Sequence, residues 1–207
     1  MQVKPTQGNL FIITAASGAG KTSLVKELLL LDKQVKLSIS HTTRAPRVGE
    51  QNGVHYHFVN ETQFLNILSE AGFLESADVH GAKYGTSQSA VDAALQAGYD
   101  VILEIDWQGA AQVRAIYPHS ISIFILPPSV ETLEQRLNNR GQDSVDVINK
   151  RVAAAREEMS HVVEFDYVTI NDSFDVALQD LMAIIRANRL KSPSQLQRYA
   201  ELVQQLT

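Results

Sequence analysis

Hydrophobic runs of about the length of one β-strand alternate with segments that repeat their hydrophobic residues at helical spacing. The runs that predict strands span residues 10–15, 101–105, 121–126 and 167–170. The segments that predict helices after them span residues 24–31, 110–116, 130–137 and 174–190. Unbroken hydrophobicity, as in Val101-Ile102-Leu103, is typical of strands that are buried on both faces. The alternation predicts an α/β fold in which helices cover both faces of a parallel sheet.

Two polar stretches interrupt this alternation. One is rich in turns and predicts an inserted subdomain, with strands at 55–59 and 73–77 and helices at 61–71 and 87–97. The other is rich in arginine, with Gly141 at a turn between two helical stretches, and predicts a mobile arm. The predicted domain spans residues 8–188, with a core at about 8–38, 99–131 and 160–188, the insertion at about 39–98, the arm at about 132–159, and a helical tail at 189–207.

Composition and charge narrow the classes of protein. The chain has 207 residues, 44% of them hydrophobic, which is enough for one sizeable core. A net charge of −5 disfavours nucleic acid and anionic membranes as partners. The absence of cysteine excludes disulfides and thiolate metal sites, and no run is long enough to span a bilayer or to act as a signal peptide. We therefore expect a soluble cytoplasmic protein with no nucleic-acid or membrane partner, and a homo-oligomer stays open.

The segment from Thr14 to Thr22 predicts a phosphate site. It lies between a predicted strand and a predicted helix, and its small residues let backbone N–H groups turn toward one point near the positive helix N-terminus. Lys21 is expected to reach the β- and γ-phosphates of a nucleoside triphosphate, and the Thr22 hydroxyl to bind Mg²⁺. The site is expected to consist of Ala15, Ala16, Ser17, Gly18, Ala19, Gly20, Lys21 and Thr22. Ala15 stands where the motif has its first glycine, so the backbone there must suit an L-residue.

Polar side chains elsewhere predict a second phosphate site and a carboxylate pair. Arg44 and Arg47 flank a proline and suit bidentate contact with phosphate, and Tyr56 and Tyr84 add hydroxyls. Glu104 and Asp106 stand two positions apart at the end of a predicted strand, so we expect both on one face at the edge where α/β sheets bind ligands. Asp106 is the candidate for Mg²⁺, directly or through water, and Glu104 for hydrogen bonds from a base. Solvated surface residues are the alternative in both cases.

The predicted arm carries a positive face formed by Arg136, Arg140, Lys150 and Arg151. Such groups neutralise charge in phosphoryl transfer and are brought in by closure, although a solvated, ion-paired face is the alternative. His55 and His57 share a predicted strand face, but no third ligand has suitable spacing, so a metal site is disfavoured there.

The order of these motifs resembles the guanylate kinase family. After the P-loop come S-x-x-T-R-x-P-R-x-G-E from Ser40, then F-L-E, Y-G-T, I-D-W-Q-G and R-x-x-x-R-G. The resemblance implies a P-loop NTPase-type core, a GMP-binding insertion and a lid, with Mg-ATP and GMP (or dGMP) as substrates in purine nucleotide metabolism. It implies GMP binding by Ser40, Arg44, Arg47, Tyr56, Glu75, Tyr84, Thr86 and Glu104, ATP binding by Arg136 and Asn171 besides the P-loop, and catalysis by Lys21, Arg44, Arg140 and Arg151. Glu104 stands where the family usually has Asp.

Physical chemistry agrees with guanine as the base. Its N1–H and N2–H₂ donors suit a carboxylate such as Glu75, and its O6 suits the hydroxyl of Ser40 or Thr86. Adenine would invert this pattern and leave buried polar groups unpaired. Two other functions stay open from the sequence: a non-catalytic interaction module that resembles the enzyme, and a P-loop kinase for another phosphorylated acceptor such as a ribosyl bisphosphate. The expected reaction is in-line transfer without a strong general base, since the acceptor is already anionic.

Overall fold

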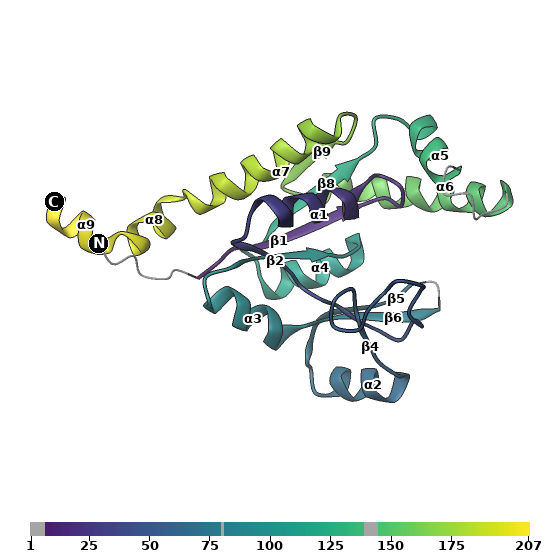
Figure 1. Cartoon of the computed structure of the whole chain (residues 1–207), viewed down its shortest axis with the longest axis horizontal. Coiled ribbons are helices and arrows are strands. Elements are labelled where there is room, and N and C mark those ends of the chain that lie inside the picture. The colour runs from purple at the N-terminus through teal and green to yellow at the C-terminus, as the bar shows by residue number, and fades with distance from the viewer. Residues whose placement is uncertain (1–6, 80, 139–144) are drawn as a thin grey trace.

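A five-stranded parallel sheet lies at the centre of the computed structural model (Figure 1). The structure describes residues 7–79, 81–138 and 145–207, and residues 145–150 by their backbone alone. The strand order of this sheet is β2-β7-β1-β8-β9. The strands are β1 (Leu10–Ala15), β2 (Val35–Leu37), β7 (Asp100–Glu104), β8 (Ile121–Leu126) and β9 (Tyr167–Ile170). The predicted α/β class and its parallel sheet are confirmed. Strand β2 was not predicted, because a three-residue strand is too short for a hydrophobic pattern.

Helices cover both faces of this sheet, and the alternation along β1 shows how. Phe11 and Ile13 pack on one face with α1 (Lys21–Leu31) and α7 (Phe174–Arg189). Leu10 and Ile12 pack on the other face with α3 (Gln88–Gln96) and α4 (Trp107–Ile116). Successive strand residues point to opposite faces, so a continuous hydrophobic run is required to fill both cores.

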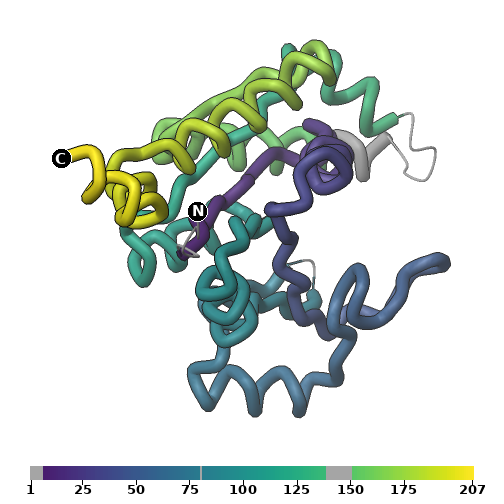
Figure 2. Tube along the Cα trace, turned by 60° about the vertical axis from the view of Figure 1, so that its left-hand side comes forward, coloured from purple at the N-terminus to yellow at the C-terminus, as the bar shows by residue number. Residues whose placement is uncertain are grey.

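The inserted residues form a lobe around a second, four-stranded sheet, seen in blue below the core in Figure 2. Its order is β4-β3-β6-β5, and its elements are β3 (His41–Thr42), β4 (His57–Phe58), α2 (Glu61–Ser69), β5 (Phe73–Val79) and β6 (Ala82–Ser87). The strand expected over 55–59 is only β4, and β3 and β6 were missed. Strand β6 forms because it pairs with β5. The two strands are antiparallel, and their pairing runs from Phe73↔Ser87 to Val79↔Ala82.

The expected arm consists of α5 (Val130–Asn138) and α6 (Val145–Ser160), followed by the short 3-10 helix η1 (His161–Glu164). Leu133 and Leu137 of α5 pack with Val152 and Ala155 of α6 and with Ala16 after β1. The arm therefore lies against the turn that follows β1. The turn expected at Gly141 falls outside the described residues.

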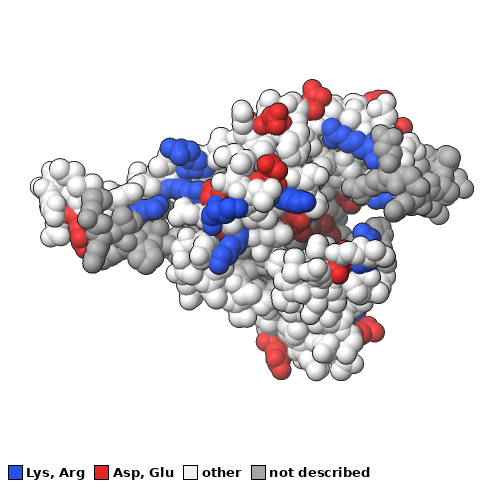
Figure 3. Space-filling view, in the orientation of Figure 1, with Lys and Arg blue, Asp and Glu red and all other residues white. Residues whose placement is uncertain are grey.

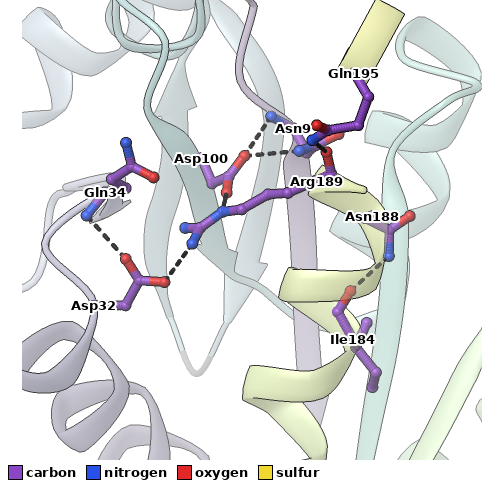
Figure 4. A network of polar contacts seen from close by, with 8 residues as sticks. All are labelled: Asn9, Asp32, Gln34, Asp100, Ile184, Asn188, Arg189 and Gln195. Carbon is purple, nitrogen blue, oxygen red and sulfur yellow. Dashed lines mark hydrogen bonds and ion pairs between the residues drawn. The ribbon is translucent and has the colours of Figure 1, made fainter. Parts of the chain in front are cut away.

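A polar network holds the end of α7 to the core (Figure 4). Arg189 Nε donates to Asp100 Oδ2 at 2.5 Å, and its Nη1 lies 2.7 Å from Asp32 Oδ2. The other oxygen of Asp100 accepts from both nitrogens of Asn9. Beyond this point the tail forms two helices, α8 (Ser192–Arg198) and α9 (Ala200–Leu206), where the sequence predicted one over 194–206. Both project from the body of the protein beyond α7 (Figure 1).

Candidate functional site

The segment expected to bind phosphate forms the turn between β1 and α1. Gly18 and Gly20 adopt φ of 93° and 99°, a region that L-residues avoid. Ala15 instead lies inside β1 and pairs with Ile125 in extended backbone, so this position does not require glycine. The structure thereby explains why alanine is tolerated where the motif has its first glycine. The backbone N–H groups at the start of α1, whose N-cap is Gly20, supply the positive end of the helix.

Two side chains from other elements hold the end of this loop. Asn171, which follows β9, donates from Nδ2 to the Ala19 carbonyl at 2.7 Å and is 5% exposed. Arg136 of α5 donates to the Asn171 carbonyl at 2.9 Å and to the Ala19 carbonyl at 3.5 Å. A Cβ on Gly20 would come within 2.3 Å of Asn171 Nδ2. Asn171 and Arg136, both expected at the ATP site, therefore contact the loop backbone.

Lys21, the first residue of α1, points back to the carboxyl ends of the strands. Its Nζ lies 3.5 Å from the carbonyl of Ile105, which also accepts from Thr14. Burial lowers the pKa of Lys21, while Glu104, Asp106 and Glu158 act in the opposite direction. The lysine thus lies among the carboxylates at the sheet edge, where a phosphate group would add further negative charge.

Glu104 and Asp106 have different surroundings, which corrects the expectation that both lie on one strand face. Glu104 is the last residue of β7, whereas Asp106 lies beyond the strand and caps α4, with Oδ1 accepting from Gly109 N–H at 2.8 Å. Oε1 of Glu104 is buried and has no hydrogen-bond partner among the described residues. Burial raises the pKa of Glu104, and Lys21 opposes that rise. The chain leaves the strand at Ile105, so period-two reasoning no longer applies there.

The inserted lobe presents a buried carboxylate to the same region. Glu75 on β5 is 5% exposed, and its Oε1 accepts from the Thr86 hydroxyl of β6 at 2.6 Å. Burial raises the pKa of Glu75 to about 7, against the effect of the Thr86 hydrogen bond. The Ser40 hydroxyl lies 3.5 Å from that of Thr86. Glu75, Thr86 and Ser40 therefore form one cluster, with Gly109 of α4 so close that an added Cβ would lie 3.0 Å from Glu75 Oε2.

The four residues expected at the second phosphate site also come from the lobe. Tyr56 and Tyr84 meet edge to face with their ring centroids 5.9 Å apart, and the Arg44 guanidinium lies 5.4 Å from the Tyr56 centroid. Burial raises the pKa of Tyr56, so its hydroxyl stays a donor. Arg47 is exposed on the loop after β3. The structure thus brings Arg44, Tyr56 and Tyr84 together, with Arg47 at the rim.

Glu50, the last residue of the motif that begins at Ser40, also belongs to this group, although it was not predicted as a site residue. Its Oε1 pairs with Arg44 Nη2 at 2.8 Å and its Oε2 accepts from the Arg47 N–H at 2.7 Å. The hydrogen bond from Arg44, followed by that from Arg47, lowers the pKa of Glu50 to about 2. Glu50 therefore fixes the conformation of the segment that carries Arg44 and Arg47. This role depends on contacts that exist only in the folded chain.

Helix α6 of the arm, which the family resemblance implies is a lid, contacts the turn after β1 at Ser17. Arg151 Nη2 donates to the Ser17 hydroxyl at 3.0 Å, and Glu158 Oε2 accepts from the Ser17 N–H at 3.2 Å. Glu158 was not predicted, because no motif in its segment distinguishes it from other glutamates. Arg140, expected in the same lid, lies outside the described residues. Figure 3 shows acidic side chains within the hollow between the core and the lobe and basic ones at its rim.

Two negative findings concern the described part of the chain. Among the side chains that the structure describes, no three or more His, Asp, Glu or Cys residues form a group that could hold a metal. His57 stacks on His41 with centroids 4.7 Å apart, while His55 Nδ1 accepts from Gln51 N–H, so the two histidines have different partners. None of the described helices is long and apolar enough to cross a membrane.

The loop at the sheet edge suits a donor phosphate, and the cluster of arginine and tyrosine side chains in the lobe suits an acceptor phosphate. The class is that of P-loop kinases whose acceptor is a phosphorylated nucleoside. The family model described as guanylate kinase matches residues 7–188, and the chain belongs to that family.

Similar proteins span nearly the whole chain. A guanylate kinase of Methylobacillus flagellatus is 68% identical over 200 residues, which cover 97% of this chain and 99% of that protein. A guanylate kinase of Psychrobacter arcticus is 57% identical over 199 residues, covering 96% of each chain. The crystal structure of guanylate kinase from Anaplasma phagocytophilum has a TM-score of 0.75 at 31% identity, covering 92% of this chain and 90% of that one.

Proposed function

We propose that this chain is a guanylate kinase that transfers the γ-phosphoryl group of ATP to GMP and forms ADP and GDP. Its membership in the family and its full-length similarity to proteins of that name support this activity. The observation that carries the choice of acceptor is Glu75, a carboxylate buried in the lobe beside two hydroxyls. Burying a carboxylate is costly, and the Thr86 hydroxyl supplies only one of the several donors that Glu75 can accept, so a ligand with further donors is favoured.

Guanine supplies those donors. Its N1–H and N2–H₂ lie side by side, and Glu75 accepts from both. The Thr86 hydroxyl already donates to Glu75, which leaves the Ser40 hydroxyl to donate to O6. Glu104, whose Oε1 is buried without a partner among the described residues, is a further acceptor for the base. Adenine has an acceptor at N1 and no N2 amino group, so it offers Glu75 neither of the two donors that guanine supplies.

Transfer of the phosphoryl group depends on positively charged side chains and on closure of the lid. Arg44, Arg47, Tyr56 and Tyr84 bind the GMP phosphate, and Lys21 binds the phosphates of ATP. The phosphate oxygen of GMP is already anionic, so no side chain has to remove a proton. Arg151, and Arg140 outside the described residues, bring charge from the lid. Closing the lid also excludes water, which would otherwise compete as acceptor.

Mg²⁺ accompanies ATP in this proposal. The Thr22 hydroxyl and the Asp106 carboxylate would hold it, directly or through water, and both offer the hard oxygen donors that Mg²⁺ prefers. Asp106 fits this role because Gly109 engages its Oδ1 and so fixes the direction of the carboxylate. When bound, the ion neutralises charge on the β- and γ-phosphates.

Measuring ADP release with ATP and each of GMP, dGMP, AMP and UMP tests the proposal. We expect turnover with GMP and dGMP and rejection of AMP and UMP. Binding of GMP without ADP release would instead indicate an interaction module. Release with a ribosyl bisphosphate alone would indicate a different kinase. A cytoplasmic location, homo-oligomerisation and the absence of nucleic-acid or membrane partners stay predictions.

A further inference from the structure

The base of the lid is held to the core by a pair of stacked rings. His161, the first residue of η1, lies directly after α6, and its imidazole stacks on the indole of Trp107 with centroids 3.5 Å apart and planes 8° apart. His161 Nδ1 lies 2.6 Å from Glu164 Oε1 and its Nε2 lies 3.9 Å from Glu157 Oε1. The contact with Glu164 holds one edge of the imidazole while its face lies parallel to the indole.

A second contact between η1 and α4 strengthens this junction. Arg114 of α4 donates from Nη2 to Glu164 Oε2 at 3.2 Å, and its guanidinium lies 5.1 Å from the ring centroid of Phe165. Glu164 therefore connects His161 to Arg114. The end of the lid is attached to α4 at its first turn and again two turns later.

The other contacts of α4 give this junction a functional position. Trp107 directly follows Asp106, which caps the helix at the sheet edge. Gln112 exchanges two hydrogen bonds of 3.1 Å with the backbone of Ser76 on β5, next to Glu75. One helix thus contacts the acceptor lobe and the base of the lid. Helix α6 also contacts the phosphate-binding loop, because its Arg151 and Glu158 form hydrogen bonds with Ser17.

We propose that His161 is a positioning residue, whose stack on Trp107 fixes the base of α6 and thereby sets where Arg151 stands relative to the transferred phosphoryl group. The inference rests on the proposed kinase activity. His161 touches no reacting atom in it. It acts through Arg151, because a rigid helix of 16 residues transmits a shift at its last turn to the arginine more than two turns away.

Two variants of similar size test the role of the ring. His161→Phe keeps an aromatic ring beside Trp107, and His161→Leu fills the same space without one. We expect His161→Leu to lower kcat about ten-fold or more, since a small misplacement of a positioning group has large effects on transfer. The KM for GMP should stay within about two-fold, because the acceptor lobe is unchanged. His161→Phe should recover most of kcat, and His119→Leu, at an exposed histidine beyond the other end of α4, should leave it unchanged.

Two further measurements separate positioning from a loss of structure. Trp107 is the only tryptophan in the chain, so its emission reports the stack directly and should change in His161→Leu but not in His119→Leu. In an Arg151→Ala background, adding His161→Leu should lower kcat no further, because the residue through which it acts is gone.

Three results would overturn the positioning role: wild-type kcat in His161→Leu despite altered emission, an equal loss in His161→Phe, or independent losses in the double variant. Absence of GMP-dependent ADP release by the wild-type chain would instead refute the proposed kinase activity, and this inference with it.

Discussion

Replacing Glu75 by Gln should make the fold more stable and the enzyme much worse. The side chain keeps its size, and its Oε1 can still accept from the Thr86 hydroxyl. The variant lacks the charge that burial disfavours: the pKa of Glu75 rises from 4.5 to about 7 on folding. Stability and acceptor recognition therefore make opposite demands on this position.

The size of the stability effect follows from that pKa. The folded carboxyl keeps its proton at pH values where the unfolded one has lost it, so the stability it contributes is complete below pH 4.5 and is lost as pH rises through 7. Each unit of difference between the folded and the unfolded pKa corresponds to about 1.4 kcal/mol, so the loss of stability at pH 8 amounts to about 3 kcal/mol. Glutamine does not ionise and loses nothing. At pH 8 the free energy of unfolding of the variant should therefore exceed that of the wild type by up to about 3 kcal/mol. At pH 4.5 the two values should be nearly equal.

Catalysis should change in the opposite direction. Glutamine turns an N–H₂ group toward the donors of guanine or offers one neutral oxygen, so two charge-assisted hydrogen bonds are lost. At about 1.5–3 kcal/mol each, kcat/KM for GMP should fall by roughly 10² to 10⁴. In the wild type, the same group should make kcat/KM for GMP decline below about pH 7, because the protonated form cannot accept both N–H groups.

Urea unfolding at pH 4.5 and pH 8 and ADP-release kinetics at pH 8 test this reasoning, with Glu70→Gln, at an exposed glutamate, as the matched control. A gain in stability that is the same at both pH values would refute the argument from burial of charge. Turnover of GMP by Glu75→Gln at the wild-type rate would refute the assignment of guanine to this carboxylate.

Three further substitutions probe other parts of the structure. Lys21→Ala should lower kcat by about 10² or more while the melting temperature stays near wild type, since it removes charge that acts on the transferred phosphate; an unchanged rate of ADP release would refute its role. Gly109→Ala places a Cβ 3.0 Å from Glu75 Oε2 and should raise the KM for GMP, measured beside an unchanged KM for ATP. Arg189→Ala leaves Asp100, 3% exposed, without its cation and should lower the free energy of urea unfolding by about 3 kcal/mol. A loss below about 1 kcal/mol would show that water takes the place of the guanidinium beside Asp100.

The sequence by itself determined the class of fold and the place of the expected phosphate-binding loop in it. Runs such as 121–126 must be buried on both faces, so a covered parallel sheet is the arrangement that satisfies them. The phosphate-binding loop is equally local, since a strand end, small residues and a helix start follow one another within nine positions. Such a feature can be predicted from the sequence, because the residues that form it are neighbours in the chain.

Tertiary structure decided what depends on residues that are distant in the chain. β6 has no pattern of its own and exists because β5 pairs with it, and the surroundings of Glu75 depend on Thr86 and on Gly109 of another helix. Glu50, Glu158 and His161 take their roles from partners that no spacing reveals. Asp106 looked like a strand residue but caps α4, because the chain turns one position earlier. Burial and distance create these properties, and both are set only when the chain has folded.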